Sequence, residues 1–443
     1  MRAGAIDAVT QPPYLRSMVA RRHIRSWYAD TANPHPEHPV LEESLDCDAC
    51  VVGGGYTGLM AALELAERGW SVLLLEAERV GWGASGRNGG QVITGYNKSM
   101  GEIAARVGPD DARKLWELVE DAKALLRDRV ERHGIRCALT WGFVLAALKD
   151  RHLAELAEAE AELRDGHGYP GLERLDRAAL SDYVRSPGYV GGLYDPGSGH
   201  LHPLNYALGL ADACVAAGVR IFEGSRVLSL DTGARPEAVT AQGRVRARVL
   251  VLAGNAYLGG LAPALARTIM PVATYILATE PLGAEGARAL LPRDVAVCDM
   301  NFAMNYFRRT ADHRLLFGGG VSYSGRDLPG VELGMRRKML RVFPDLAGVK
   351  TSHLWGGRVA ITINRLPHLG RLSPTTYFAH GYSGHGVALA GIAGRVIAEA
   401  AAGTAERFDV FARIPHRSFP GGPGLRTPAL VLAMLWFRLR DLL

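Results

Sequence analysis

The residues with the clearest chemical potential lie near the C-terminus, in the segment GYSGHGVALAGIAG at residues 381–394. A tight glycine-rich turn there holds Tyr382, Ser383 and His385, and small apolar residues at helical spacing follow it. A helix that begins at such a bare turn presents free N–H groups and the positive end of its dipole, which stabilise negative charge. The segment is therefore suited to a bound group that becomes anionic during a reaction.

Two other kinds of chemistry fit this turn poorly. A hydrolase nucleophile requires the pattern G-x-S-x-G, and here His385 stands where the last glycine should be. A metal site requires more ligands than one histidine with hydroxyl neighbours. His200 and His202 could place two imidazoles on one strand face, but no third ligand is apparent, so we predict no metal site.

A second set of functional residues lies upstream, in CDACVVGGGYTGLMAALELAERGWSVLLLEAE at residues 47–78. This segment predicts a strand, a glycine turn, a helix and a second strand. Gly53, Gly55 and Gly58 form GxGxxG, in which the glycines make a tight turn, admit a pyrophosphate and let helix and strand pack closely. Glu76 ends the second strand, where a carboxylate can accept both ribose hydroxyls of an adenosine. The pattern predicts a dinucleotide cofactor.

Three later segments favour FAD over NAD. The loop GWGASGRNGGQV at residues 81–92 could wrap a flat ring system and offer Ser85 and backbone N–H groups to phosphate. Residues 218–230 predict a strand pair in which Val227 could hydrogen-bond an adenine, and a later buried strand ends at Gly254. An enzyme that binds only NAD does not need these extra contacts. The predicted cofactor-binding residues are Gly53, Gly55, Tyr56, Thr57, Gly58, Glu76, Ala77, Gly83, Ser85, Arg87, Asn88, Gly89, Gly90, Gln91, Val227, Gly254, Gly384, His385, Gly386 and Val387.

The composition of the 443-residue chain argues against several partners. Its net charge of +6 is concentrated in residues 1–28 and 407–443, so the nearly neutral body is unlike a nucleic-acid-binding surface. No run approaches the roughly 20 apolar residues that span a bilayer, and no apolar stretch follows the basic N-terminus to make a signal peptide. Five cysteines, an odd number, indicate the reducing cytoplasm. Cys47 and Cys50 have redox spacing, but a strand would point them to opposite faces.

Together these motifs resemble the D-amino-acid oxidase superfamily of FAD enzymes, and within it they most resemble the γ-glutamylputrescine oxidoreductase branch. The resemblance rests on GxGxxG with Glu76 and on GASGRNGGQ, GHLHPLNYALGLADA, YFRRTADHRLLFGGG, WGGRVAITINRLPHLG and GYSGHGVALA. It extends from about residue 24 to the C-terminus.

The resemblance implies an α/β fold with two interleaved domains. A Rossmann-type FAD-binding domain would alternate along the chain with an α+β substrate domain, whose mostly antiparallel β-sheet roofs the flavin. The implied segments are a basic N-terminal arm (1–45), the FAD-binding domain (46–131, 201–270 and 352–405), the substrate domain (132–200 and 271–351) and an amphipathic C-terminal tail (406–443).

Two departures from the family pattern refine the expected chemistry. Sarcosine oxidases of this superfamily attach FAD through a cysteine shortly before the last flavin motif, whereas the nearest upstream cysteine here is Cys298, so non-covalent FAD is implied. Those enzymes also carry a lysine that pairs with the substrate carboxylate, and the matching position here is Ala388. This difference favours an amine over an α-amino acid.

The resemblance implies oxidation of a primary or secondary amine. Hydride would pass from the carbon beside nitrogen to flavin N5, the imine would hydrolyse to an aldehyde, and O2 would be reduced to H2O2. The expected substrate is a γ-glutamylated polyamine or a related amine, and Arg308 and Arg358 could bind its distal carboxylate. Aromatic faces would hold the amine near the flavin without charging it. The residues expected to line this catalytic pocket are Tyr275, Tyr306, Trp355 and Tyr382.

Three alternatives remain open. A quinone-linked amine or amino-acid dehydrogenase would use LRTPALVLAMLWFRLRDLL, the apolar and basic C-terminal end, as an interfacial membrane helix, although docking on the protein itself is favoured because the basic residues are few. A flavin-dependent tRNA-modifying protein is disfavoured by the nearly neutral body. A non-catalytic flavin-binding module would leave the roof domain without a purpose.

Overall fold

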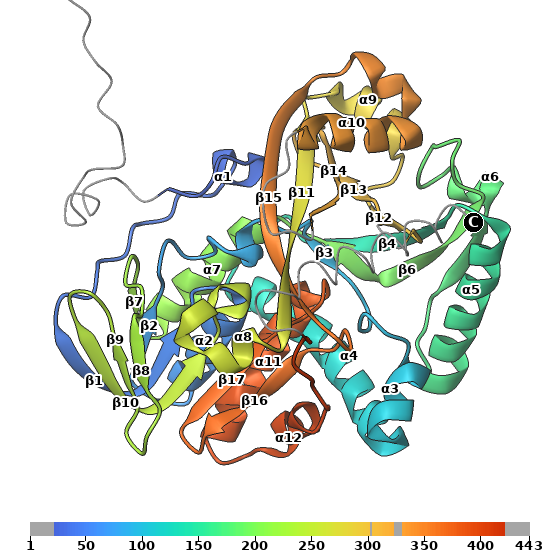
Figure 1. Ribbon diagram of the computed structural model, residues 1–443. Coiled ribbons are helices and arrows are strands. Elements are labelled where there is room, and N and C mark those ends of the chain that lie inside the picture. Colours follow the sequence, from blue (N-terminus) through green and yellow to red (C-terminus); the bar gives the residue numbers. More distant parts are fainter. Residues whose placement is uncertain (1–21, 302–303, 323–329, 421–443) are drawn as a thin grey trace, which may run out of the picture.

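The computed structural model describes residues 22–301, 304–322 and 330–420, which build two large β-sheets with helices around them (Figure 1). An eight-stranded sheet has parallel strands at its centre, and a nine-stranded sheet is mostly antiparallel. This arrangement confirms the expected α/β fold with a Rossmann-type sheet and a second, roofing sheet. Residues 1–21 of the expected basic arm and residues 421–443 of the expected tail lie outside the described residues.

Strand β1 (Ser44–Val52) lies in the middle of the eight-stranded sheet and pairs in parallel with β2 and β10. The last four residues of β1 and all of β2 are buried, which is typical of parallel strands covered on both faces. Because parallel strands end at one edge, the turns after these strands come together there. The other strands of this sheet are β2 (Val72–Leu75), β7 (Arg220–Phe222), β8 (Ser229–Asp231), β9 (Glu237–Val239), β10 (Arg244–Leu252), β16 (His368–Ser373) and β17 (Thr376–His380).

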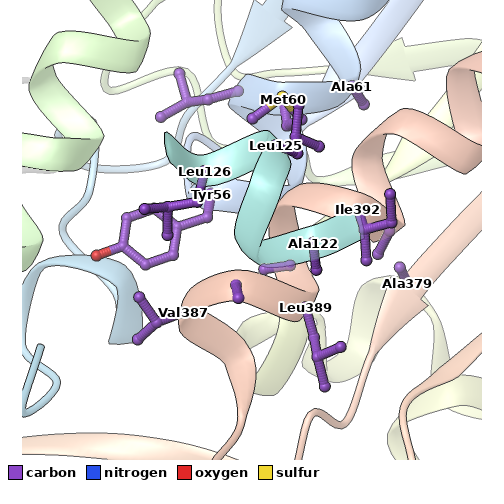
Figure 2. Close-up of a cluster of buried hydrophobic side chains, with 14 of the residues drawn as sticks. Tyr56, Met60, Ala61, Ala122, Leu125, Leu126, Ala379, Val387, Leu389 and Ile392 are labelled. Carbon is purple, nitrogen blue, oxygen red and sulfur yellow. The ribbon is translucent and has the colours of Figure 1, made fainter. Parts of the chain in front are cut away.

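Helices α2 (Tyr56–Glu67), α4 (Pro109–Arg132) and α11 (Gly386–Ala401) pack together on one face of this sheet. Figure 2 shows apolar side chains from all three meeting in this cluster. Buried charge reinforces the contact, since Arg129 of α4 lies 2.6 Å from a carboxylate oxygen of Glu64 in α2. The remaining helices are α1 (Trp27–Asp30), α3 (Met100–Val107), α5 (Asp150–Ala161), α6 (Arg177–Leu180), α7 (Pro203–Ala216), α8 (Pro263–Ala266), α9 (Gly283–Leu290), α10 (Val331–Val342) and α12 (Glu406–Ala412).

The nine-stranded sheet has two different faces. On one, Phe317 packs with Met335 and Met339 of α10 in a separate apolar cluster. On the other, Ile276 and Trp355 join the cluster that contains α2 and α11, so this face looks toward the cofactor-domain helices. The strands are β3 (Gln91–Val92), β4 (Thr140–Ala147), β5 (Glu173–Asp176), β6 (Gly191–His200), β11 (Ile269–Thr279), β12 (Ala296–Asp299), β13 (Tyr306–Arg309), β14 (Leu315–Ser322) and β15 (Thr351–Thr362).

Several segments differ from the expected division of the chain. The boundary at residue 352 falls inside β15, which pairs along β11 in the nine-stranded sheet, and β3 pairs with β6 in that sheet too. The expected strand pair over 218–230 is wrong, because β7 pairs with β2 while β8 pairs with β9. In each case, pairing between segments distant in the chain decides which sheet a strand joins. The local sequence pattern of a strand does not indicate its pairing partner.

Both ends of the described chain pack into the body. In α1, Trp27 and Tyr28 are buried, and in α12 the side chain of Phe408 is fully buried. The described parts of the arm and of the tail therefore pack against the rest of the protein through these side chains. Among the described residues no single helix is long and apolar enough to cross a membrane; α11 and α12 pass that test only as a pair bent by 120°.

Candidate cofactor and substrate site

Two cavities meet at the edge where β1, β2 and β10 end. The larger, of about 1500 Å³, and the smaller, of about 620 Å³, share Gly55, Ser85 and Asn255 in their walls, so they form one elongated site. Predicted cofactor residues that line the larger cavity are Gly53, Gly55, Glu76, Ala77, Gly83, Ser85, Val227 and Gly254. Those that line the smaller cavity are Gly55, Tyr56, Thr57, Ser85, Asn88, Gly384, Gly386 and Val387.

The glycine turn before α2 leaves no room for side chains. A Cβ on Gly58 would overlap the carbonyl oxygen of Gly53, and a Cβ on Gly55 would lie 2.9 Å from Oγ of Ser85. Ser85 in turn accepts a hydrogen bond from the backbone N–H of Tyr56, at 3.0 Å, in the first turn of the helix. Bare backbone, a hydroxyl and a helix N-terminus converge here, which is the arrangement that binds a pyrophosphate.

Glu76 ends β2 with both carboxylate oxygens engaged by backbone donors. Oε2 accepts from the N–H of Gly54 at 2.7 Å, and Oε1 accepts from the N–H of Glu78 at 2.9 Å. Burial raises the pKa of Glu76, and these two donors oppose that shift. Each oxygen keeps a second lone pair, so the side chain is held in place and can still accept ribose hydroxyls.

We expect Glu76→Gln to weaken FAD binding by about 1.5–3 kcal/mol, since it removes a charge-assisted acceptor and turns an amide NH2 toward a backbone N–H. FAD titration of the apoprotein, followed by quenching of flavin fluorescence, measures the affinity. Glu43→Gln is a matched control, because Glu43 is an exposed acid before β1 that pairs with Arg220. Equal FAD affinity in both variants would remove Glu76 from the site.

The opening turn of α11 is strained at a residue that is not glycine. Ser383 has φ of 51°, in the left-handed region that serine seldom adopts. Its N–H donates to the carbonyl of Ala360 at 3.1 Å, and its Oγ accepts from the N–H of Thr362 at 3.2 Å. Strain of this kind persists where the surroundings over-determine a conformation, which is common at binding sites.

Two asparagines outside the predicted set complete the support of this turn. Asn97 donates from Nδ2 to the carbonyl of Ser383 at 2.9 Å, and Oδ1 of Asn255 accepts from the N–H of Gly381 at 3.0 Å. Asn255 is itself left-handed, with φ of 45°, and lines both cavities. Both contacts join loops far apart in the chain, so no local motif marks them.

We predict that Asn97→Asp weakens FAD binding about tenfold, because a carboxylate replaces the donor and repels the Ser383 carbonyl. The same FAD titration measures the effect. Asn33→Asp is a suitable control, since Asn33 donates in the same way to the carbonyl of Arg136 on the surface, at 2.9 Å. An Asn97 variant that binds FAD as tightly as this control would show that the turn does not depend on the contact.

The structure brings three of the four predicted pocket aromatics to the cofactor side. Tyr382 lines the smaller cavity and shares a 2.6 Å hydrogen bond with the hydroxyl of Thr57. A Cβ on Gly89 would lie 2.8 Å from the ring of Tyr306, which therefore rests on the glycine loop. Trp355 donates from Nε1 to the carbonyl of Arg87 at 3.0 Å.

Tyr275 is separated from the other three aromatics. It packs with Phe317 and Met339 in the apolar cluster on the far face of the nine-stranded sheet. Its neighbour Ile276 belongs to the cofactor-side cluster, as alternation along a strand requires. The expectation that Tyr275 lines the pocket with Tyr306 is therefore not supported by its position.

The two arginines expected to bind a carboxylate have different surroundings. Arg308 is buried, and its guanidinium donates to the carbonyls of Gly89 and Leu201, each at 3.0 Å. Arg358 is exposed on β15, directly before Val359, which lines the smaller cavity. Of the two, Arg358 is therefore better placed to reach a substrate.

The remaining predicted cofactor residues support the site from behind or beside it. Gly89 and Gln91 lie beside Tyr306, around a crevice too narrow to admit water. His385 precedes α11 as its N-cap residue, and burial lowers its pKa to about 4. Gly90 lies so close to Leu201 that a Cβ would overlap its carbonyl oxygen.

Arg87 carries unpaired buried donors. Its guanidinium lies 3.9 Å from the centroid of the Trp82 ring, and Nε and Nη2 are buried without a hydrogen-bond partner. Burial lowers its pKa. Arg87 is not among the residues that line either cavity, so its predicted contact with the cofactor stays a prediction.

Other candidate sites from the sequence do not assemble. His200 ends β6 and lies 3.3 Å from a carboxylate oxygen of Asp294, whereas His202 caps α7. Within the described ranges, no three His, Cys, Asp or Glu side chains are arranged to hold a metal ion. Cys47 and Cys50 lie on β1 and are free thiols, like the other three cysteines.

FAD fits this site on several independent observations. The glycine turn and Ser85 suit a pyrophosphate, Glu76 suits a ribose, and the glycine-lined mouth of α11 suits a ring that gains negative charge.

Comparison with known proteins agrees with this geometry. The model of the DAO family, described as FAD-dependent oxidoreductase, matches residues 48–400. The chain is 44% identical to γ-glutamylputrescine oxidoreductase of Escherichia coli, over 95% of this chain and 98% of that protein. It is 42% identical to the probable oxidoreductase OrdL of Haemophilus influenzae, over 95% and 98%.

Solved structures show the same fold at low sequence identity. Glycine oxidase from Bacillus cereus superimposes with a TM-score of 0.69 at 18% identity, covering 84% of this chain and 99% of that one. Glycine oxidase from Geobacillus kaustophilus gives a TM-score of 0.67 at 21% identity, covering 81% and 95%.

Proposed function

The chain belongs to the DAO family of FAD-dependent oxidoreductases, and from this premise we propose that it oxidises an amine whose preferred form is a γ-glutamylated polyamine. The observation that carries the proposal is the single elongated site, with a pyrophosphate turn at one end and the mouth of α11 at the other. The similarity to a γ-glutamylputrescine oxidoreductase supports the substrate class.

Bound FAD supplies the two-electron acceptor for hydride that leaves the carbon beside the amine nitrogen. Residues of the chain hold and tune it. The N-terminus of α2 and Ser85 would hold the pyrophosphate, and Glu76 the ribose. The first N–H groups of α11 would face the flavin, where they favour negative charge.

The substrate must arrive as a neutral amine in a pocket from which water is excluded. Burial raises the pKa values of Tyr306 and Tyr382, so both phenols stay neutral and do not charge the amine. Ala388, buried in α11, stands where related oxidases carry a carboxylate-binding lysine. An amine whose carboxylate lies farther from the reacting carbon suits this pocket better than an α-amino acid.

We propose that FAD is bound without a covalent link and predict that acid precipitation releases all of the flavin. Cys298, the nearest cysteine upstream of the last flavin motif, is buried, and its Sγ lies 3.3 Å from Sδ of Met304. Burial raises the pKa of the Cys298 thiol, which disfavours the reactive thiolate. Flavin absorbance in the supernatant and pellet measures the partition. Colour retained in the washed pellet would contradict non-covalent binding.

We propose O2 as the electron acceptor and a reducing compartment, the cytoplasm, as the location; the five free cysteines support the latter. The test is turnover of γ-glutamylputrescine in air, with aldehyde and H2O2 measured together. Equal amounts of both products are expected. Aldehyde formation that requires a quinone analogue and yields no peroxide would favour the quinone-linked alternative.

A further inference from the structure

Arg308 is a buried cation with unusual partners. It lies on β13, and its side chain is only 5% exposed. All three nitrogen positions donate hydrogen bonds, and the four acceptors are the carbonyl of Gly89 (3.0 Å), the carbonyl of Arg309 (3.3 Å), the carbonyl of Leu201 (3.0 Å) and the hydroxyl of Tyr28 (3.2 Å). Four of the five N–H donors of the guanidinium are therefore engaged inside the protein.

These partners come from separate parts of the fold that meet at the cofactor loop. Gly89 belongs to the loop after β2, Leu201 joins β6 to α7, and Tyr28 belongs to α1 of the arm. The loop and Leu201 also bond directly, since the N–H of Leu201 donates to the carbonyl of Gly90 at 2.8 Å. Arg308 thus ties the roof sheet and the arm to the loop expected to wrap the flavin.

The charge of Arg308 has no acidic counter-ion. In the described part of the chain, no carboxylate oxygen lies within 4.0 Å of its guanidinium, and its acceptors are neutral. Its charge also acts on a neighbouring histidine. The pKa of His202 is lowered to about 3, mainly by burial and then by the positive charge of Arg308. A cation that is buried, hydrogen-bonded and unpaired keeps a strong local field because little water screens it.

We propose that Arg308 is a positioning residue for the FAD site, which holds the Gly89 carbonyl and supplies a fixed positive charge favouring the reduced, anionic flavin. It is not the receptor for a substrate carboxylate. The inference rests on the proposed function only in taking FAD as the cofactor. Arg308 thereby has a different role from the one expected from the sequence, which was to bind the distal carboxylate of the substrate.

Three variants of the holoenzyme separate these roles. Arg308→Met removes charge and hydrogen bonds, Arg308→Lys keeps the charge but loses the planar fork, and Tyr28→Phe removes one acceptor only. For each we measure the FAD dissociation constant and the midpoint potential of bound flavin, with a chemical reductant and no amine. Amine turnover gives the ratio of kcat/KM for γ-glutamylputrescine to that for putrescine.

Arg308→Met should weaken binding of reduced FAD at least tenfold more than that of oxidised FAD, which lowers the two-electron potential by about 30 mV. Arg308→Lys should keep most of the potential while binding both forms more weakly, and Tyr28→Phe should change the potential little. The substrate ratio should stay constant. An unchanged potential and FAD affinity with a fallen ratio would overturn the proposal. If the methionine variant fails to fold, a lysine variant with wild-type FAD affinity overturns it.

Failure of the proposed substrate has a different signature. An enzyme that no amine reduces would still show the shifts in potential and FAD affinity, because those measurements use no amine. Arg358→Met is the matched control for carboxylate recognition, since Arg358 is exposed and precedes the cavity residue Val359. It should leave the potential unchanged.

Discussion

Replacing Gly58 by alanine is expected to abolish FAD retention. A Cβ at this position would overlap the backbone oxygen of Gly53, and neither group can move away as a flexible side chain could. Relief requires the start of α2 to shift from β1, which distorts the turn proposed to hold the pyrophosphate. Overpacking of this kind costs about 1–3 kcal/mol in stability and sometimes more. We expect FAD affinity to fall at least 100-fold, which titration of the apoprotein measures.

Gly391→Ala is the matched control for this prediction. Gly391 lies in α11 of the same domain, and the nearest atom to an added Cβ is the terminal methyl of Met60, at 3.6 Å. A glycine-to-alanine change inside a helix stabilises by roughly 0.5–1 kcal/mol where there is room. This variant should therefore keep FAD and melt at or above the wild-type temperature. Retention of FAD by the Gly58 variant at the control's affinity would refute the assignment of the turn.

The protein should lose stability steeply as the pH falls below about 6.5. Three imidazoles are packed together where β16 and β17 meet the segment after α12. His380 and His368 share a 3.0 Å hydrogen bond between ring nitrogens, and His368 stacks on His416 with centroids 4.1 Å apart. Burial lowers the pKa of His368 to about 2, of His380 to about 3 and of His416 to about 4.

These lowered pKa values determine how the stability of the fold changes with pH. The unfolded chain takes up protons as the pH falls below 6.5, while the folded cluster stays neutral until about pH 4, so acid favours unfolding. Each extra proton contributes about 1.4 kcal/mol per pH unit, and three histidines together give roughly 4 kcal/mol per unit. Urea denaturation of the holoenzyme between pH 7.5 and 5.0 measures the slope.

One variant distinguishes the contribution of this cluster to acid sensitivity from that of the other buried histidines. His416→Gln should reduce the slope by about 1.4 kcal/mol per pH unit, because one titrating group is gone. Nε2 of His416 donates to the carbonyl of Pro367 at 3.2 Å and does not take part in the hydrogen bond between His368 and His380, so the substitution leaves those two paired. A slope that is the same in both proteins would mean that the cluster is not the source of acid sensitivity.

The parts of the site that the sequence predicts well are contiguous ones. GxGxxG, Glu76 and the turn at 381–386 each need only neighbouring residues and a standard strand–helix geometry, and the structure places most of them on the cavity walls. The burial of β1 and β2 follows from their unbroken apolar runs. Local pattern and fold agree at these positions.

The parts that sequence reasoning missed depend on contacts between distant segments. The bond from Asn97 to Ser383 joins residues 286 positions apart, and nothing near either residue marks it. Arg308 has the right chemical type for a carboxylate receptor, but its hydrogen bonds to Gly89 and Leu201 appear only when the sheets are assembled. For Tyr275, the side of the sheet that it faces decides its role, and this depends on the register of β11.

The most direct test of the account is anaerobic mixing of the purified holoenzyme with single candidate substrates while the visible flavin absorbance is recorded. γ-Glutamylputrescine should bleach the flavin fully and fastest, putrescine should do so more slowly, and glycine should leave the spectrum unchanged within the same time. This order is expected from the proposal that the pocket binds a neutral amine whose carboxylate lies far from the reacting carbon. Bleaching by glycine but by neither amine would contradict the central claim that this FAD enzyme is an amine oxidoreductase of the γ-glutamyl polyamine type.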